Sequence, residues 1–201
     1  MIVRQIGLFF GSFNPIHIGH MVIAGTMLEH TDLDEVWFVV SPHNPLKDRK
    51  SLLDDQARLE MVRLAIHDDY RMRACDIEFR LPRPSYTILT LTRLGEIYND
   101  KQFSLIMGSD NLDTFDKWRN YQHILDQYHI YVYPRPNHTG EKFIGHPHVT
   151  MVEVPTMDIS STYIRNQIKD GYDVKHLLPP PVYTYLTEMH YYETGLSKPK
   201  S

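Results

Sequence analysis

The chain has 201 residues, of which 42% are hydrophobic and 23% charged, and its formal net charge is −4. This composition is typical of one globular domain or a closely packed pair, and it excludes a disordered or collagen-like chain. Because nucleic-acid binders usually carry a basic excess, we expect no nucleic-acid partner, although a local cationic pocket remains compatible with the charge.

A lone cysteine, Cys75, cannot form an internal disulfide, so nothing requires an oxidising compartment. The longest apolar run, residues 36–40, is far shorter than the ~20 residues of a membrane span. The N-terminal stretch also lacks the features of a signal peptide. We therefore expect a cytoplasmic protein with no membrane partner, built as a single domain over residues 1–196 with a polar tail at 197–201.

Apolar, β-rich runs alternate with helical patterns along most of the chain. In chain order we expect a strand at 2–10, a turn at 11–15, a helix at 18–30, a strand at 35–41, a helix at 54–66, a strand at 72–77, a helix at 86–98, a strand at 103–107, a polar segment at 109–116, a short helix around 124–125, strands at 129–133 and 149–154, and helices at 160–168 and 183–190. This alternation predicts an α/β fold: a Rossmann-like, doubly wound, mostly parallel sheet with helices on both faces. Ligands of such sheets bind beyond the carboxyl ends of the strands, near the point where strand order reverses.

The strongest chemical signal lies in residues 11–20, which read Gly-Ser-Phe-Asn-Pro-Ile-His-Ile-Gly-His. Gly11 permits a tight turn after the strand and the close approach of a ligand. His17 and His20 are three residues apart, so they share one face at the start of a helix. A helix N-terminus with two imidazoles favours a phosphate site. Zinc is disfavoured, because the spacing is not His-Glu-x-x-His and no cysteine or carboxylate ligand is nearby.

A second candidate phosphate site lies near the other end of the chain. Ser160 and Ser161 are good N-cap residues before a helical run, and Arg165 follows about one turn later. Hydroxyls, free first-turn amides and a guanidinium together suit a β- or γ-phosphate. An ordinary capped helix is the simpler interpretation, but the pairing with the histidine segment favours the functional one.

These segments resemble known motifs. Residues 17–20 (His-Ile-Gly-His) resemble the HxGH motif of the nucleotidyltransferase superfamily, and residues 159–165 (Ile-Ser-Ser-Thr-Tyr-Ile-Arg) resemble the ISSTxxR motif of small adenylyltransferases. Residues 84–87 (Pro-Ser-Tyr-Thr), residues 108–112 (Gly-Ser-Asp-Asn-Leu) after a strand, and Trp118 further resemble the nicotinate-nucleotide adenylyltransferase family. The resemblance runs from residue 8 to residue 165. It departs from the family at Asn14, where many members have Asp, and at Lys47, which is shifted by three residues.

The resemblance implies transfer of the adenylyl group of ATP to nicotinate mononucleotide, giving deamido-NAD and pyrophosphate in NAD biosynthesis. It implies catalytic roles for His17, His20 and Arg165. It further implies that ATP contacts Gly11, Ser12, Phe13, His17, His20, Gly108, Asp110, Arg135, Ser160, Ser161 and Arg165. Contacts with the mononucleotide are implied for Lys47, Ser85, Tyr86, Thr87 and Trp118, with the indole stacked on the pyridine ring. Mg²⁺ is expected as the cofactor that accompanies ATP, with no metal site made by the protein alone.

The segment at 84–87 also offers a physical reason for preferring the acid nucleotide. We interpret Ser85 as the N-cap of the following helix, so that the amides of Tyr86 and Thr87 face its entrance. A carboxylate is favoured at such a helix start over a neutral carboxamide, which favours nicotinate over nicotinamide.

Other functions remain open at this point. One is a related adenylyltransferase acting on nicotinamide mononucleotide or pantetheine phosphate. Another is a non-catalytic nucleotide-binding module on the same fold, since a fold does not fix a function. A third is a metal binder using His43, His146 or His148, although the last two lie in a loop rich in Gly and Pro and are interpreted as solvated. A homo-oligomer is compatible with the sequence, which does not fix the oligomeric state.

Overall fold

A computed structural model describes residues 3–42 and 52–193 of the chain. Its six-stranded sheet has the order β3-β2-β1-β4-β5-β6, and every neighbouring pair of strands is parallel. The strands are β1 (Arg4–Gly11), β2 (Glu35–Val40), β3 (Met72–Cys75), β4 (Lys101–Gly108), β5 (Ile130–Tyr133) and β6 (Val149–Met151). The strand order reverses between β1 and β4, so the predicted doubly wound α/β fold is confirmed.

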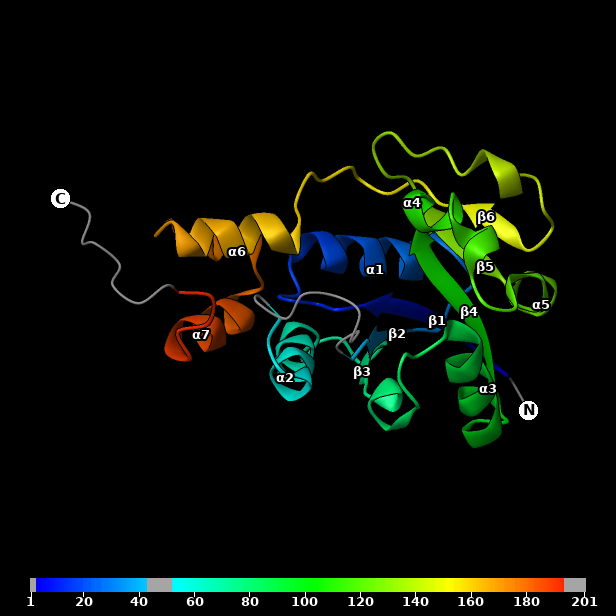
Figure 1. Cartoon of the computed structure of the whole chain (residues 1–201), viewed down its shortest axis with the longest axis horizontal. Helices are drawn as coiled ribbons and strands as arrows, with labels where there is room; N and C mark the ends of the chain where they lie inside the picture. The colour runs from blue at the N-terminus through cyan, green and yellow to red at the C-terminus, as the bar shows by residue number, and fades with distance from the viewer. Residues whose placement is uncertain (1–2, 43–51, 194–201) are drawn as a thin grey trace.

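Helices cover both faces of the sheet (Figure 1). The α-helices are α1 (Ile18–His30), α2 (Asp55–Ala65), α3 (Thr87–Ile97), α4 (Ser109–Leu112), α5 (Tyr121–Gln127), α6 (Ser161–Lys169) and α7 (Pro180–Glu188). Short 3₁₀ turns lie at η1 (Ile77–Arg80), η2 (Phe115–Lys117), η3 (Glu141–Phe143) and η4 (Lys175–Leu177). None of the helices within residues 3–42 and 52–193 combines the length and the apolar character that crossing a membrane would take.

The core has two halves because successive residues of a strand point to opposite faces of the sheet. Phe9 and Phe38 pack on one face with residues of α1, α2, α6 and α7. Leu8 and Leu105 pack on the other face with residues of α3, α4 and α5. Burial on both faces explains why β2 reads as a continuous apolar run rather than an alternating one.

Most expected elements are present, with three informative differences at their ends. β6 stops at Met151 rather than at 154, because its partner β5 is only four residues long and ends at Tyr133. The last helix begins at Pro180 rather than at 183, since proline fits the first helical turn, where its missing N–H is not needed. The third strand ends at Cys75, and the chain turns into η1. The expected tail at 197–201 and the boundary at 196 fall outside the described residues.

Candidate active site

The predicted histidine segment lies at the carboxyl end of β1, beside the reversal of strand order. The backbone of Phe13 adopts a φ of 46°, a conformation that bulky residues rarely take and that marks a locally strained turn. The Phe13 ring fills the space beside Gly11, where an added Cβ would come within 2.8 Å of it. Gly11 therefore makes room for this aromatic ring, and Ser12 is left exposed at the turn.

Two imidazoles stack at the start of α1. His17 is the N-cap of the helix, and its ring lies 3.8 Å from that of His20, centroid to centroid. Gly19 lets the His17 ring fold back, because a Cβ there would lie 3.1 Å from it. The His17 backbone amide donates to Nδ1 of His20 over 3.2 Å. A neutral His20 therefore carries its proton on Nε2 and offers an N–H donor there.

Both histidines are held in the neutral form. Burial lowers the pKa of His17 from 6.5 to about 4, and the nearby Arg135 cation contributes to the lowering. The pKa of His20 lies well below its ordinary value, because surrounding protein atoms desolvate the ring and because His17 and Arg135 lie close. Near neutral pH the site therefore presents imidazole N–H dipoles rather than two imidazolium charges.

The second motif meets the first in space. The Ser161 hydroxyl donates to the Pro15 carbonyl over 2.8 Å, and the Arg165 guanidinium donates to the Asn14 carbonyl over 2.8 Å. Ser160 caps α6 as predicted, its hydroxyl accepting from the Tyr163 amide over 3.1 Å. The N-terminus of α6 thus lies next to the start of α1, although 146 residues of sequence separate Pro15 from Ser161 (Figure 1).

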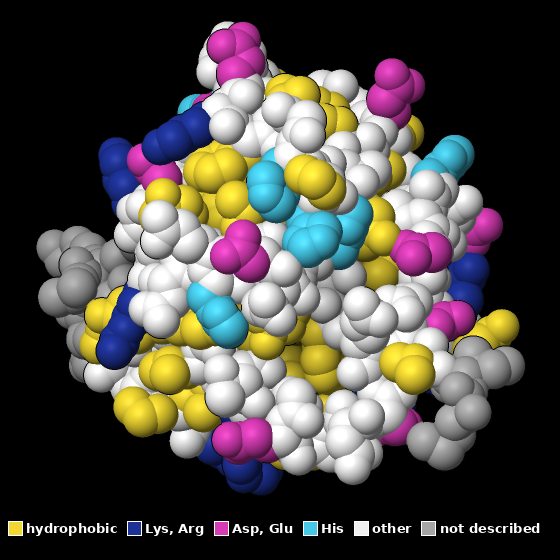
Figure 2. Space-filling view, turned by 90° about the vertical axis from the view of Figure 1, so that its right-hand side faces the viewer, with side chains coloured by type: hydrophobic (Ala, Val, Ile, Leu, Met, Phe, Trp, Pro, Cys, Tyr) yellow, Lys and Arg dark blue, Asp and Glu magenta, His cyan; other side chains and the backbone are white. Residues whose placement is uncertain are grey.

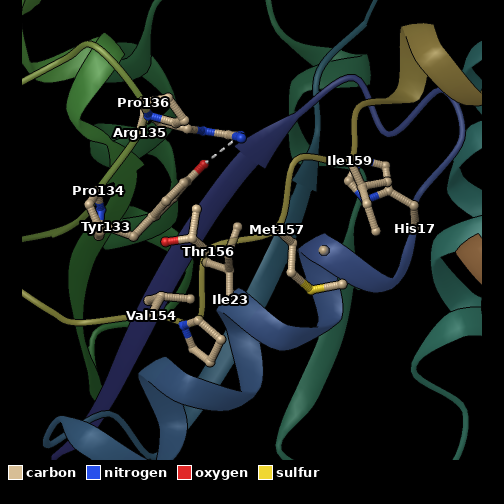
Figure 3. Close-up of a pocket in the computed structure, with 12 residues that line it drawn as sticks. His17, Ile23, Tyr133, Pro134, Arg135, Pro136, Val154, Thr156, Met157 and Ile159 are labelled. Carbon is tan, nitrogen blue, oxygen red and sulfur yellow. Dashed lines mark hydrogen bonds between the residues drawn. The ribbon is translucent and has the colours of Figure 1, made fainter.

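A pocket of about 420 Å³, open to solvent, lies between these segments and the end of β5. Figure 3 shows Arg135 and Tyr133 on one side of it and His17 with Ile159 on the other. Arg135 donates to the Tyr133 hydroxyl over 3.4 Å. Thr156 and Met157, from the chain between β6 and α6, complete the wall. Apolar surface and convergent polar groups are what a small-molecule pocket requires.

Three buried side-chain atoms of the described residues lack a hydrogen-bond partner, and all belong to this region: His17 Nδ1, Asp110 Oδ1 and Arg135 Nε. The Asp110 and Arg135 atoms lie 3.9 Å apart, too far for a hydrogen bond. An added Cβ on Gly108 would lie 2.3 Å from Asp110 Oδ1, so this glycine makes room for the carboxylate. Asp110 and Arg135 thus form a long ion pair without a hydrogen bond. Buried polar atoms usually have hydrogen-bond partners, so these three atoms suit a polar ligand.

A second pocket, of about 360 Å³, adjoins the first on the α4 side. Trp118 and Asn111 line it, and Tyr133 lines both pockets. The Arg119 guanidinium lies 4.9 Å from the Tyr86 ring, which brings residues 84–87 next to the Trp118 segment. Trp118 is only half-buried and packs on Phe115, so part of its indole remains free for a ligand.

The expected role of Ser85 as a helix cap is wrong. The N-cap of α3 is Tyr86, so the first-turn amides belong to Thr87 and Ile88 rather than to Tyr86 and Thr87. The Ser85 hydroxyl donates instead to the carboxylate of Glu78 over 3.3 Å.

Sequence reasoning missed two residues that hold the site together. Arg58 is fully buried, and its guanidinium donates to the carbonyls of Ser12 and Ser41 at the ends of β1 and β2. In the sequence, the one indication of this role is a charged residue at a position within the apolar stripe of the helix. The Tyr192 hydroxyl donates to Asn14 Oδ1 over 2.6 Å. No local pattern could have found this contact across 178 residues of sequence.

Two expectations lie outside the described residues: Lys47 as a phosphate ligand and His43 as a metal ligand. Figure 2 shows histidine side chains gathered on one face, and ring contacts join His129, His146 and His148. Within the described part of the chain, however, no group of three or more His, Cys, Asp or Glu side chains could hold a metal ion. The geometry gives the metal-binding alternative no support.

Residues 8–167 match the cytidylyltransferase-like family model. The chain is 51% identical to the "Probable nicotinate-nucleotide adenylyltransferase" of Flavobacterium johnsoniae, over 94% of this chain and 99% of that protein. It is 47% identical to the relative of the same name from Bacteroides fragilis, over 91% of each chain. The solved structure of Plasmodium falciparum nicotinic acid mononucleotide adenylyltransferase complexed with NaAD has the same fold, with a TM-score of 0.77 and 18% identity over 94% of this chain and 97% of that one. The chain therefore belongs to the nicotinate-nucleotide adenylyltransferase family and carries its cytidylyltransferase-like domain.

Proposed function

We propose that this protein transfers the adenylyl group of ATP to nicotinate mononucleotide, releasing pyrophosphate and deamido-NAD. The observation that carries the proposal is the meeting of the two motifs: α6 donates from Ser161 and Arg165 to the turn that precedes His17. Two adjoining pockets that share Tyr133 lie at the reversal of strand order, where we assign the two nucleotides.

ATP is assigned to the pocket between His17 and Arg135. The first-turn amides of α6, with Arg165 beside them, suit the β- and γ-phosphates that leave as pyrophosphate. His17, His20 and Arg135 lie where the α-phosphate would meet the acceptor. The unpaired Nε of Arg135 and Nδ1 of His17 are the atoms that a bound phosphate and its water would satisfy.

Nicotinate mononucleotide is assigned to the second pocket. Trp118 offers its free indole face to the pyridine ring, an aromatic contact worth ~1 kcal/mol beyond the buried area. The N-terminus of α3 and the Arg119 cation beside Tyr86 supply positive potential for a carboxylate. This arrangement favours the acid over the amide.

The chemistry needs little beyond position and charge. The attacking phosphate monoester has a second pKa of ~6, so it is mostly dianionic at neutral pH and requires no general base. Two unit charges 4 Å apart repel by ~4 kcal/mol at an effective dielectric of about 20. The residues around the α-phosphorus must offset that repulsion. The Nε2–H of neutral His20 would donate to an α-phosphate oxygen as negative charge builds on it.

Adenylyl transfer from ATP involves a divalent metal ion, which we propose is Mg²⁺. Among the described residues no group of three or more His, Cys, Asp or Glu side chains could hold a metal ion, so they fit an ion held mainly by phosphate oxygens and water, and Asp110 offers a buried carboxylate oxygen that makes no hydrogen bond. When bound, the ion would neutralise part of the triphosphate charge.

The purified protein should release pyrophosphate from ATP only when an acceptor is added. We expect nicotinate mononucleotide to be used more efficiently than nicotinamide mononucleotide, with pantetheine phosphate inactive. Equal kcat/KM for acid and amide would contradict the argument from the start of α3. No pyrophosphate with any acceptor would instead support a non-catalytic nucleotide-binding module.

Replacing Trp118 tests the second pocket. Trp118→Ala should raise KM for nicotinate mononucleotide roughly tenfold, because a lost stacking contact and lost buried area together are worth about 1.4 kcal/mol. Steady-state kinetics with each substrate varied in turn should show little change in KM for ATP. Trp118→Phe keeps an aromatic ring and should lose less. If KM for both substrates rose together, Trp118 would serve only to pack against Phe115 and would not bind the acceptor.

A further inference from the structure

A buried carboxylate lies beneath residues 84–87, which we name the Pro84 loop. Glu78, in η1, has only 3% of its surface exposed. Thr90 donates to its Oε1 over 2.8 Å, and Ser85 donates to its Oε2 over 3.3 Å. The Ser41 hydroxyl also donates to this carboxylate.

Stability alone does not explain an acidic residue here. Burial raises the pKa of Glu78, and the three hydroxyl donors counteract that effect. Among the described residues no Lys, Arg or His forms an ion pair with it. A buried charged group is costly, and an apolar side chain would often be at least as stable in its place. Burial of the Glu78 carboxylate thus lowers stability, and we look to its hydrogen bonds with the hydroxyl groups for its role.

The three donors come from three different places in the fold. Ser41 follows β2 at the carboxyl edge of the sheet, where the pocket between His17 and Arg135 also lies. Ser85 belongs to the Pro84 loop, and Thr90 lies within α3. Glu78 therefore ties the loop to the helix that follows it and to the carboxyl end of the sheet. The short helical turn η1, which carries Glu78, packs against both β2 and α3.

The residue before the loop is held by a second network. Arg83 donates to the Asp55 carboxylate over 2.9 Å, and the same carboxylate accepts from Arg58 over 2.6 Å. Arg58 in turn donates to the carbonyls of Ser12 and Ser41. Side-chain hydrogen bonds therefore hold Arg83, just before the Pro84 loop, and Ser85, within it.

We propose that Glu78 is a positioning residue for the acceptor nucleotide, an inference that rests on the proposed function. It holds Ser85, and with it the start of α3, beside the segment that carries Trp118 and Arg119 next to the second pocket. Glu78 itself touches no substrate and acts through the Ser85 hydroxyl. The contacts of Glu78 thereby link the acceptor site to the same edge of the sheet at which the ATP pocket lies.

A double-mutant cycle in KM tests this assignment. Glu78→Ala and Ser85→Ala should each raise KM for nicotinate mononucleotide, by about tenfold and about fivefold respectively, while KM for ATP and kcat change less than about twofold. The double variant should be no worse than Glu78→Ala, because both changes remove the same contact. Glu78→Gln keeps an acceptor oxygen and should recover most of the loss. Thr92→Ala, which removes an exposed hydroxyl from the same helix, is the matched control and should match the unmodified protein.

Hydrogen–deuterium exchange of the amides of residues 85–88 gives a readout that does not depend on activity. Without substrates, these amides should exchange faster in Glu78→Ala and Ser85→Ala than in the unmodified protein or in Thr92→Ala. Should Glu78→Ala not fold, Glu78→Gln replaces it in the cycle, with an expected rise in KM of about threefold. Additive effects of Glu78 and Ser85, equal rises in KM for both substrates, or unchanged exchange would each overturn the proposal. An unmodified protein that is inactive with nicotinate mononucleotide would instead refute the proposed function, and the exchange experiment would still test the anchoring of the loop.

Discussion

His20→Ala should lower kcat by about 10²–10³-fold while KM for nicotinate mononucleotide changes no more than a few-fold. Removing a single preorganised donor to a developing charge typically has an effect of this size. His20 is oriented for that role because the His17 amide donates to its Nδ1, which leaves Nε2–H as the donor. Its ring is further held by edge contacts with Phe9 and Phe13. Acceptor-dependent pyrophosphate release, measured with both ATP and nicotinate mononucleotide saturating, gives kcat directly.

His30→Ala is the matched control for this substitution. His30 is an exposed imidazole at the other end of α1, so its removal changes the same helix without touching the site. It should leave kcat and both KM values unchanged. Turnover of His20→Ala within a few-fold of the unmodified protein would show that the stacked imidazoles do not stabilise the transferring group.

The sequence predicted the fold and the meeting of the two motifs for a physical reason. In a parallel sheet the carboxyl ends of all strands lie at the same edge, so the turn after β1 and the segment that leads from β6 into α6 both lie there, whatever their separation along the chain. The α1 bounds followed from the spacing of its apolar residues, and Ser160 acts as the N-cap its position suggested. These are local patterns, or direct consequences of topology.

What the sequence could not predict depends on how side chains pack in the folded protein. Ser85 was expected to cap a helix, as its type and position allow, but its hydroxyl is taken by the buried Glu78. The Asn14 side chain receives a hydrogen bond from Tyr192, a contact that only the tertiary packing of the C-terminal segment creates. The position of the Asp110 carboxylate beside Gly108 is likewise set by the packed structure, and the implied contact of Gly108 with ATP stays a prediction. For Ser85 and Asn14 the side chain has a hydrogen-bond partner that no local sequence rule specifies.

The neutral histidines predict that folding stability falls as the pH is lowered from about 7. The pKa of His17 is about 4 in the folded protein and 6.5 as its ordinary value, so between these values the unfolded chain binds a proton that the folded protein does not. Stability therefore rises with pH over this range. The contribution of His17 is fully present above pH 6.5 and is lost as the pH falls toward 4. A pKa change of one is worth about 1.4 kcal/mol, so the loss is about 2 kcal/mol by pH 5 and about 3 kcal/mol in full.

Urea unfolding at pH 7.5, 6 and 5 measures this loss, and His17→Gln isolates it. The free energy of unfolding of His17→Gln should fall by about 2 kcal/mol less between pH 7.5 and 5 than that of the unmodified protein. His30→Gln removes an exposed imidazole from the same helix and is the matched control; its pH dependence should follow the unmodified protein. A non-hydrolysable ATP analogue should reduce the loss of stability at low pH, because a bound triphosphate favours the protonated imidazole of His17 and raises its pKa. If the free energy of unfolding had the same pH dependence in His17→Gln and the unmodified protein, His17 would not be held neutral by burial. The site would then not present neutral imidazole N–H donors.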